Sequence, residues 1–186
     1  MAPVRLEQAR VSYSDLQQLP EDGPRYELYD GEVVVVPAPV PRHQIVSREL
    51  LYIFIDYTRA HGGVVLASPL DIVFSEYNVV QPDLVVFAPG REHCIKLDEP
   101  TRHAPDIAVE ILSPSTAAID RGRKMRLLAR YGVPEYWMLE PKGKRVEVHV
   151  LRDGAFTLVR VTRQHDVVRS ALLPDLSFPA ARIFPF

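Results

Sequence analysis

The sequence predicts an α/β protein: a mixed central sheet flanked by helices, with a hairpin near the N-terminus. Three patterns predict this fold. Two long stretches carry apolar residues at helical spacing, short apolar runs lie between and after them, and an Asp-Gly pair joins two early runs. Because one helix precedes the middle strands and the other follows them, both can cover the same sheet. We expect residues 1–186 to form a single domain, since this length supports a core of its own.

The N-terminal half is expected to hold a short helix, the hairpin and the first long helix. A capped helix stopped by proline is predicted for Ser12–Pro20, and a hairpin with an Asp30-Gly31 turn for Arg25–Pro39. The first long helix is predicted over Pro41–Gly63, where glycine supplies the C-cap. Its apolar stripe consists of Ile45, Leu50, Ile53, Phe54 and Tyr57.

The middle of the chain is expected to hold short strands and one surface loop. Strands are predicted at "VVLASP", "DIVFS" and "PDLVVFA", which span residues 64–69, 71–75 and 82–88. The polar stretch 91–102 predicts the loop, and "PDIAVEILS" predicts the next strand.

The C-terminal part is expected to hold the second long helix, three strands and a tail. The helix is predicted over 115–132, with Ser115 or Thr116 as its N-cap. Three strands joined by turns near Pro141-Gly143 and Asp153-Gly154 are predicted over 134–161. The proline-containing tail is expected to wrap irregularly.

Composition excludes some classes of protein. The formal net charge is −2, so any contact with nucleic acid must be a local patch and not a general basic surface. A single cysteine excludes an internal disulfide framework and suits a reducing compartment. We see no signal peptide and no apolar run of membrane-spanning length, so the expected location is the cytoplasm.

Two carboxylates stand inside the most hydrophobic strands. Asp83 opens the run in "VVQPDLVVFAPG", and Glu110 lies in the middle of "PDIAVEILSPST". A buried carboxylate without a partner is costly, and two neighbouring ones repel each other. A hard divalent cation relieves both problems, because Mg²⁺ prefers carboxylate oxygens, water and phosphate as ligands. If the two strands pair, Asp83 and Glu110 can share one Mg²⁺ or Mn²⁺ ion.

A lysine can be placed beside these acids by arithmetic. Lys124 lies ~12 Å into the second helix, at 1.5 Å per residue. Glu110 lies ~10 Å before the end of its strand, at 3.3 Å per residue. A helix that packs back along the sheet therefore brings Lys124 level with Glu110. Two acids, a metal and a lysine are the groups that phosphodiester hydrolysis requires.

The same residues carry a resemblance. The segments "QPD" and "VEILSPST" resemble the PD-(D/E)XK nuclease superfamily. The order "YELYDGEVV", a histidine, "QPDLVVF", "VEILSPST" and "DRGRKMRLLARYGVPEYWMLEP" resembles, within it, the Uma-two family of restriction-endonuclease-like proteins. The likeness covers about residues 26–141 and implies a restriction-endonuclease-like fold for the chain.

The resemblance implies roles for particular residues. Asp83 and Glu110 would be the metal carboxylates, and Ile111 would offer its backbone carbonyl to the metal. The superfamily places its lysine two residues after the acid, where this chain has Leu112. The Uma-two pattern has a lysine in the following helix instead, which corresponds to Lys124.

The resemblance and the position of each residue suggest roles for two more side chains. Glu27 matches a glutamate of the family's hairpin pattern and would assist a second ion. His43 stands at the start of the first long helix and would touch a phosphate or a water molecule at the metal.

The expected function is therefore metal-dependent hydrolysis of phosphodiester bonds, with DNA as the expected substrate. The alternative is a catalytically inactive module that keeps the fold and binds nucleic acid or protein. Leu112 at the usual lysine position and the absence of a global basic charge favour that alternative. A weaker alternative is a metal-dependent hydrolase of another substrate.

Three further features have plainer interpretations. Ser113 and Ser115 lack the Gly-x-Ser-x-Gly motif of a nucleophile and are expected to cap a helix. The arginines after residue 120 can bind phosphate or form a solvated helix face. The apolar side chains of "EYWMLEP" and of the tail predict a twofold homodimer, unless the tail folds back over its own sheet.

Overall fold

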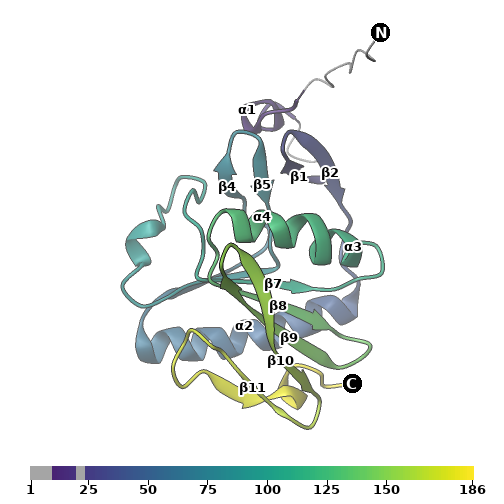
Figure 1. The fold of residues 1–186 in the computed structure, drawn as a ribbon, viewed down its shortest axis with the longest axis vertical. Helices are drawn as coiled ribbons and strands as arrows, with labels where there is room; N and C mark the ends of the chain where they lie inside the picture. The colour runs from purple at the N-terminus through teal and green to yellow at the C-terminus, as the bar shows by residue number, and fades with distance from the viewer. Residues whose placement is uncertain (1–9, 20–23) are drawn as a thin grey trace.

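A computed structural model describes residues 10–19 and 24–186 of the protein. The strands form a six-stranded sheet, a four-stranded sheet and a two-stranded ribbon. Figure 1 shows the four-stranded sheet at one end of the molecule and the ribbon at the other. The predicted α/β fold with mixed sheets and flanking helices is thus confirmed. None of the helices in the described part of the chain has the length and hydropathy needed to cross a membrane.

The four-stranded sheet is built from two hairpins. Its order is β2-β1-β5-β4, and the strands are β1 (Arg25–Tyr29), β2 (Glu32–Val36), β4 (Ile72–Ser75) and β5 (Asn78–Val80). The predicted turn is present: Asp30 and Gly31 both have positive φ, 53° and 85°, as a tight hairpin turn requires. The sequence analysis did not identify β5, a strand of only three residues.

Helix α1 (Tyr13–Leu16) adjoins this sheet and begins where it was predicted. Ser12 caps it, because its hydroxyl accepts a hydrogen bond from the Asp15 amide and the Asp15 carboxylate accepts one from the Ser12 amide. The predicted stop at Pro20 lies outside the described residues.

The six-stranded sheet has the order β10-β9-β8-β7-β6-β3. Its strands are β3 (Val64–Ala67), β6 (Leu84–Phe87), β7 (Ile107–Ile111), β8 (Glu135–Glu140), β9 (Arg145–Arg152) and β10 (Ala155–Arg163). Only the central pair, β7 and β8, runs parallel. A parallel pair needs a crossover connection, and the second helical segment supplies it. The predicted loop between β6 and β7 contains one short turn, η1 (Glu92–Cys94).

Helices cover both faces of the six-stranded sheet (Figure 1). Helix α2 (Pro41–His61) packs against Leu84, Val86 and Val109, and ends at Gly62 as predicted. Its buried stripe begins at Val46 instead of Ile45, which is only partly buried.

The crossover helix covers the opposite face and is irregular. It consists of α3 (Ala117–Ile119), a π-helical segment η2 (Asp120–Lys124) and α4 (Met125–Arg130). Its first turn starts at Thr116, one of the two predicted N-caps, although the Thr116 side chain makes no capping bond. Sequence periodicity did not reveal the π segment.

The C-terminal tail is ordered, which corrects the expectation of irregular wrapping. It forms β11 (Val167–Arg169), β12 (Ser177–Pro179) and the turn η3 (Ala180–Arg182). Its apolar side chains join the core around Trp137, which is fully buried and lies near the rings of Phe54 and Phe178.

A buried acid fastens the tail to the sheet. The carboxylate of Glu135 on β8 accepts hydrogen bonds from the Ser170 hydroxyl and from the amides of Ala171 and Leu172. It also accepts one from the Trp137 indole. The homodimer prediction relied on the apolar surplus of this region, and the structure buries most of that surplus within one chain. Self-association stays a prediction, and the apolar side chains of this region support it less than expected, although Leu172 and Phe186 remain exposed.

A buried carboxylate and lysine cluster as the candidate active site

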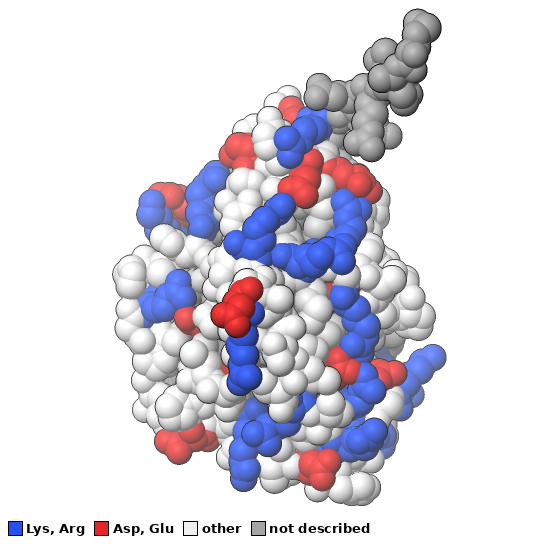
Figure 2. Space-filling view, in the orientation of Figure 1, with Lys and Arg blue, Asp and Glu red and all other residues white. Residues whose placement is uncertain are grey.

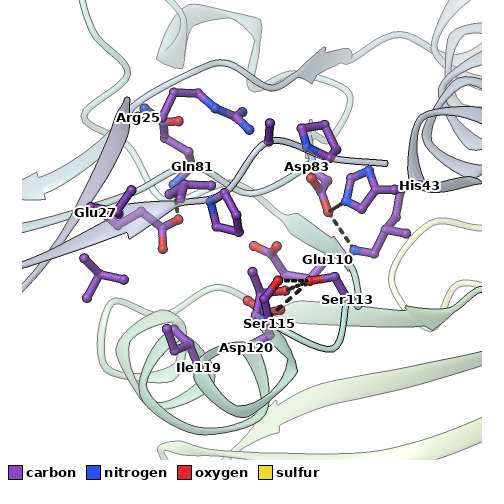
Figure 3. A pocket seen from close by; sticks show the side chains of 18 of the residues that line it. Arg25, Glu27, His43, Gln81, Asp83, Glu110, Ser113, Ser115, Ile119 and Asp120 are labelled. Atoms are coloured by element: carbon purple, nitrogen blue, oxygen red, sulfur yellow. Dashed lines mark hydrogen bonds and ion pairs between the residues drawn. The ribbon is translucent and has the colours of Figure 1, made fainter. Parts of the chain in front are cut away.

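A pocket of about 240 Å³ lies where the N-terminal hairpin, the central strands and the crossover helix meet. Figure 3 shows acidic side chains from several of these elements turned toward the same space. This pocket is lined by every residue that the sequence analysis predicted for the site. They are Glu27 of β1, His43 of α2, Asp83 of the loop before β6, Glu110 and Ile111 of β7, and Lys124 of the π segment.

The two strand carboxylates are neighbours. Strands β6 and β7 are antiparallel with Leu84 opposite Val109, and one further step of this register places Asp83 opposite Glu110. Side chains alternate between sheet faces, so these two acids point to the same face. The Ile111 amide donates a hydrogen bond to Asp83 Oδ2 at 2.7 Å, which fixes Asp83 against the strand of Glu110.

His43 holds Asp83 from the other side. Its Nε2 lies 3.0 Å from Asp83 Oδ2 (Figure 3). An ionised carboxylate only accepts hydrogen bonds, so Nε2 is the donor. The Nδ1 atom of the ring is buried and has no hydrogen-bond partner among the described residues. The proline-started first turn of α2 thus presents a histidine with one free ring nitrogen at this pocket.

Lys124 lies beside Glu110, as the helix arithmetic predicted. Its Nζ is 2.8 Å from Glu110 Oε1 and 2.8 Å from Glu27 Oε1, and 3.5 Å from Asp120 Oδ1. The lysine is only 4 % exposed. One ammonium group therefore serves as the shared counter-ion of three buried acids.

Glu27 is fully engaged by protein groups. Its Oε1 also accepts a hydrogen bond from the Gln81 amide at 2.7 Å, and its Oε2 accepts one from the Tyr29 hydroxyl at 2.6 Å. Glu27 therefore orients Lys124 in this structure. The expected role in binding a second ion stays a prediction.

The sequence analysis missed Asp120. It is 2 % exposed, and its Oδ2 is buried without a hydrogen-bond partner in the part of the chain that the structure describes. Its spacing of four residues from Lys124 is a signal for a helical ion pair, and this signal could have found it. Both residues belong to the π segment, a form of helix that occurs frequently at functional sites.

Burial dominates the electrostatics of the cluster. Desolvation raises the pKa of Glu110 well above its ordinary value, although Lys124 opposes the shift and the other acids add to it. Desolvation likewise raises the pKa of Asp120. For Lys124, burial alone lowers the pKa, but the attraction of Glu110, Glu27, Tyr29 and Asp120 together raises it well above its ordinary value. The lysine therefore stays charged.

The donor set fits a divalent cation of the kind that needs few protein ligands. Asp83 and Glu110 each keep one carboxylate oxygen without a hydrogen-bond partner among the described residues. Within residues 10–19 and 24–186, no three His, Cys, Asp or Glu side chains form a ready metal site. Mg²⁺ is commonly held by one or two carboxylates and completes its shell with water and phosphate. Asp83 and Glu110 match that pattern, and Asp120, which shares Lys124 with Glu110 and Glu27, is a further acid nearby.

Two features with plainer interpretations can be compared with the structure. The expected helix capping by Ser113 and Ser115 is not found, because the N-cap is Thr116 and its side chain makes no capping bond. The Ser113 hydroxyl instead accepts a hydrogen bond from the Thr116 amide and contacts Ser115, so these serines shape the turn before the crossover helix. Positive side chains gather over the crossover helix (Figure 2). Several arginines of η2 and α4 are paired with acids: Arg121 with Glu147, Arg123 with Glu32, and Arg130 with Asp30.

Comparison with known proteins gives the family. A family model described as "Putative restriction endonuclease", Uma2, matches residues 13–181. A curated relative, "Uncharacterized protein slr1290" from Synechocystis, is 28% identical over 116 residues, and the match spans 62% of this chain and 60% of that protein.

A solved structure from Anabaena variabilis, described as a putative nuclease belonging to DUF820, has the same fold. Its TM-score is 0.75 at 19% identity, and the match covers 94% of this chain and 98% of that one. Because the family model extends over most of the sequence, the chain belongs to the Uma2 family of restriction-endonuclease-like proteins.

Proposed function

We propose that this protein is a divalent-metal-dependent nuclease that hydrolyses phosphodiester bonds in DNA. The observation that carries the proposal is the 2.8 Å contact between Lys124 and Glu110 in a pocket that Asp83 also lines. A neutral or apolar group at either position would be cheaper for folding, since buried ion pairs cost desolvation energy. Membership of the Uma2 family supports the proposal.

Asp83, Glu110 and the Ile111 carbonyl would hold Mg²⁺ or Mn²⁺. When bound, such an ion supplies charge neutralisation for phosphate and activation of water. The remaining tasks fall to the chain itself. Glu27 and Asp120 hold Lys124 in place and keep it charged, so that its ammonium can donate hydrogen bonds to a phosphate oxygen as negative charge develops there.

His43 has a supporting role in this proposal. Its Nε2 fixes Asp83. Its Nδ1, for which residues 10–19 and 24–186 supply no hydrogen-bond partner, can accept a hydrogen bond from the attacking water or contact a phosphate oxygen. The rigid contact of Asp83 with both His43 and the Ile111 amide keeps the first carboxylate in a constant position beside the second.

A cleavage assay tests the proposal. Supercoiled, linear and single-stranded DNA are incubated with the purified protein and Mg²⁺ or Mn²⁺, and nicked or linear products are quantified. We expect metal-dependent cleavage that Asp83→Asn reduces by about a hundredfold or more. The matched control is Asp98→Asn, an exposed aspartate of the loop before β7.

Calorimetry separates the proposal from the inactive-module alternative. Leu112 at the usual lysine position is the observation that favours this alternative. If the site is catalytic, calorimetry should detect binding of Mg²⁺ or Mn²⁺ to the wild type and not to Asp83→Asn. Absence of both metal binding and cleavage would leave the alternative as the function.

A further inference from the structure

A second hollow, of about 230 Å³, adjoins the candidate active site. The two spaces share the walls formed by Val40, His43, Ser113 and Pro114. The second hollow is therefore the space next to Asp83 and Glu110 into which a bound strand has room to extend.

The floor of the hollow is apolar. Leu112, Ala117 and Pro141 line it, and Val40 at its edge is 61% exposed. Leu112 occupies the position where the superfamily has its lysine, and it packs only partly into the core below. The migration of the lysine to Lys124 thus leaves an apolar surface open beside the acids.

The rim of the hollow carries positive charge from three separate elements. Arg42 comes from the first turn of α2, Arg121 from the π segment and Lys142 from the turn between β8 and β9. Arg121 is paired with Glu147, whereas Arg42 and Lys142 make no ion pair with any described residue. The one acid on the rim, Glu140, lies 3.6 Å from Arg145.

An apolar floor between cations is complementary to a nucleobase flanked by its phosphates. In a duplex the base faces are stacked and inaccessible, so only an unpaired base can reach such a floor. Proteins that bind single strands combine the same two elements, a surface for bases and cations for the backbone.

We propose that the hollow lined by Leu112 and Val40 receives an unpaired base next to the cleaved phosphate, so that the substrate class is single-stranded or locally unpaired nucleic acid. This inference rests on the proposed nuclease function and adds the form of the substrate. Arg42 and Lys142 hold the phosphates on either side of that base.

Binding measurements without divalent metal test the inference separately from cleavage. Fluorescence anisotropy compares a labelled single DNA strand, the same strand in a duplex, and an abasic strand with the same number of phosphates. We expect the base-bearing single strand to bind roughly tenfold more tightly than either of the others. Equal or tighter binding of the duplex, or of the abasic strand, would overturn the inference.

Variants locate the effect. Val40→Asn and Leu112→Asn should weaken binding of the base-bearing strand several-fold and leave the abasic strand unchanged. Val40 is largely exposed, so this variant reports on the hollow even if Leu112→Asn folds poorly. If Val40→Asn binds the base-bearing strand as tightly as the wild type and keeps the preference for single strands, the base does not lie in this hollow.

The rim has its own control. Arg42→Gln and Lys142→Gln should weaken binding of the base-bearing and the abasic single strand alike. Each change should reduce the slope of log K against log salt concentration by the equivalent of about one phosphate contact. Lys96→Gln, which removes an exposed lysine paired with Glu99 on a distant loop, should change neither. Single-strand preference without any cleavage would reject the nuclease and support this inference, whereas cleavage without that preference would do the reverse.

Discussion

Two buried glutamates on adjacent strands of the same sheet have opposite surroundings. Glu110 lies on β7 and Glu135 on β8, and desolvation is the largest cause of a raised pKa in both. Glu135 accepts four hydrogen bonds from uncharged donors, which fasten the tail. Glu110 has one charged partner, Lys124, which it shares with two other acids.

This difference separates Glu135, an acid that completes the fold, from Glu110, the acid that we propose takes part in catalysis. The donors around Glu135 are two main-chain amides, the Ser170 hydroxyl and the Trp137 indole, all of them uncharged groups of the protein itself. The environment of Glu110 contains more carboxylates than cations and opens onto a pocket, so an added cation improves it. Burial alone does not distinguish the two residues, and the kind of partner does.

The largest effect on stability is expected for Lys124→Met. The change keeps the side-chain volume but leaves Glu27, Glu110 and Asp120 buried without their shared cation. Loss of one partner of a buried ion pair costs about 3–5 kcal/mol, which urea denaturation of the metal-free protein would measure.

The control for this variant is Lys96→Met on the exposed loop, which should stay close to the wild type. Unchanged stability of Lys124→Met would mean that the three acids do not depend on the lysine, and the contrast with Glu135 would disappear.

A smaller loss is expected for Glu135→Ala. The Trp137 indole and two main-chain amides would lose their acceptor, at a cost of about 1–3 kcal/mol in the free energy of unfolding. Metal binding and cleavage should remain, because neither Glu135 nor the groups that donate hydrogen bonds to it line the pocket. Loss of metal binding without unfolding would show that the two regions are coupled.

Glu110→Gln should change stability little in the metal-free protein, or raise it, because it removes one of several mutually repelling carboxylates while Lys124 keeps Glu27 and Asp120. Cleavage should fall by about a hundredfold or more. Thermal unfolding and the plasmid assay measure the two effects. A clear fall in the melting temperature would instead assign Glu110 to the structural class of Glu135.

The smallest effect concerns pH. The pKa of Glu135 is raised in the folded protein, so folding favours its protonated form, and the stability it contributes is lost as pH rises from the ordinary value of 4.5 through the raised value. Glu135→Ala has no carboxyl group at this position, so its stability does not fall for this reason as pH rises. The stability gap between wild type and variant should therefore narrow as pH increases, as urea denaturation at several pH values would show. A gap that widens would mean that hydrogen bonding outweighs burial at this acid.

Local sequence patterns predicted the site residues that lie on the central strands and on the helix that directly follows them. Asp83 and Glu110 were identifiable because acids are unusual in apolar strands, and Lys124 because a crossover helix must return along the sheet. The contacts of Glu27 could not be derived in this way, because they depend on how the N-terminal hairpin docks against the crossover helix.

Other features needed tertiary information. The π segment that carries Asp120 and Lys124 leaves no mark in the apolar periodicity, and β5 is too short for its pattern to be recognised. The tail was misjudged because its prolines indicate irregular chain, whereas Phe178 and Ile183 pack into the core. The strands of the tail are stable only because their apolar side chains pack against the sheet beneath them, and the position of that sheet cannot be read from the local sequence.

The single tryptophan gives the molecule an optical probe of its own. Trp137 is fully buried, packs near Phe54 and Phe178, and donates its indole N–H to Glu135. Its fluorescence emission therefore reports whether the tail is docked, and release of the tail would shift the emission to longer wavelength. Unfolding of the tail can thus be followed without any label.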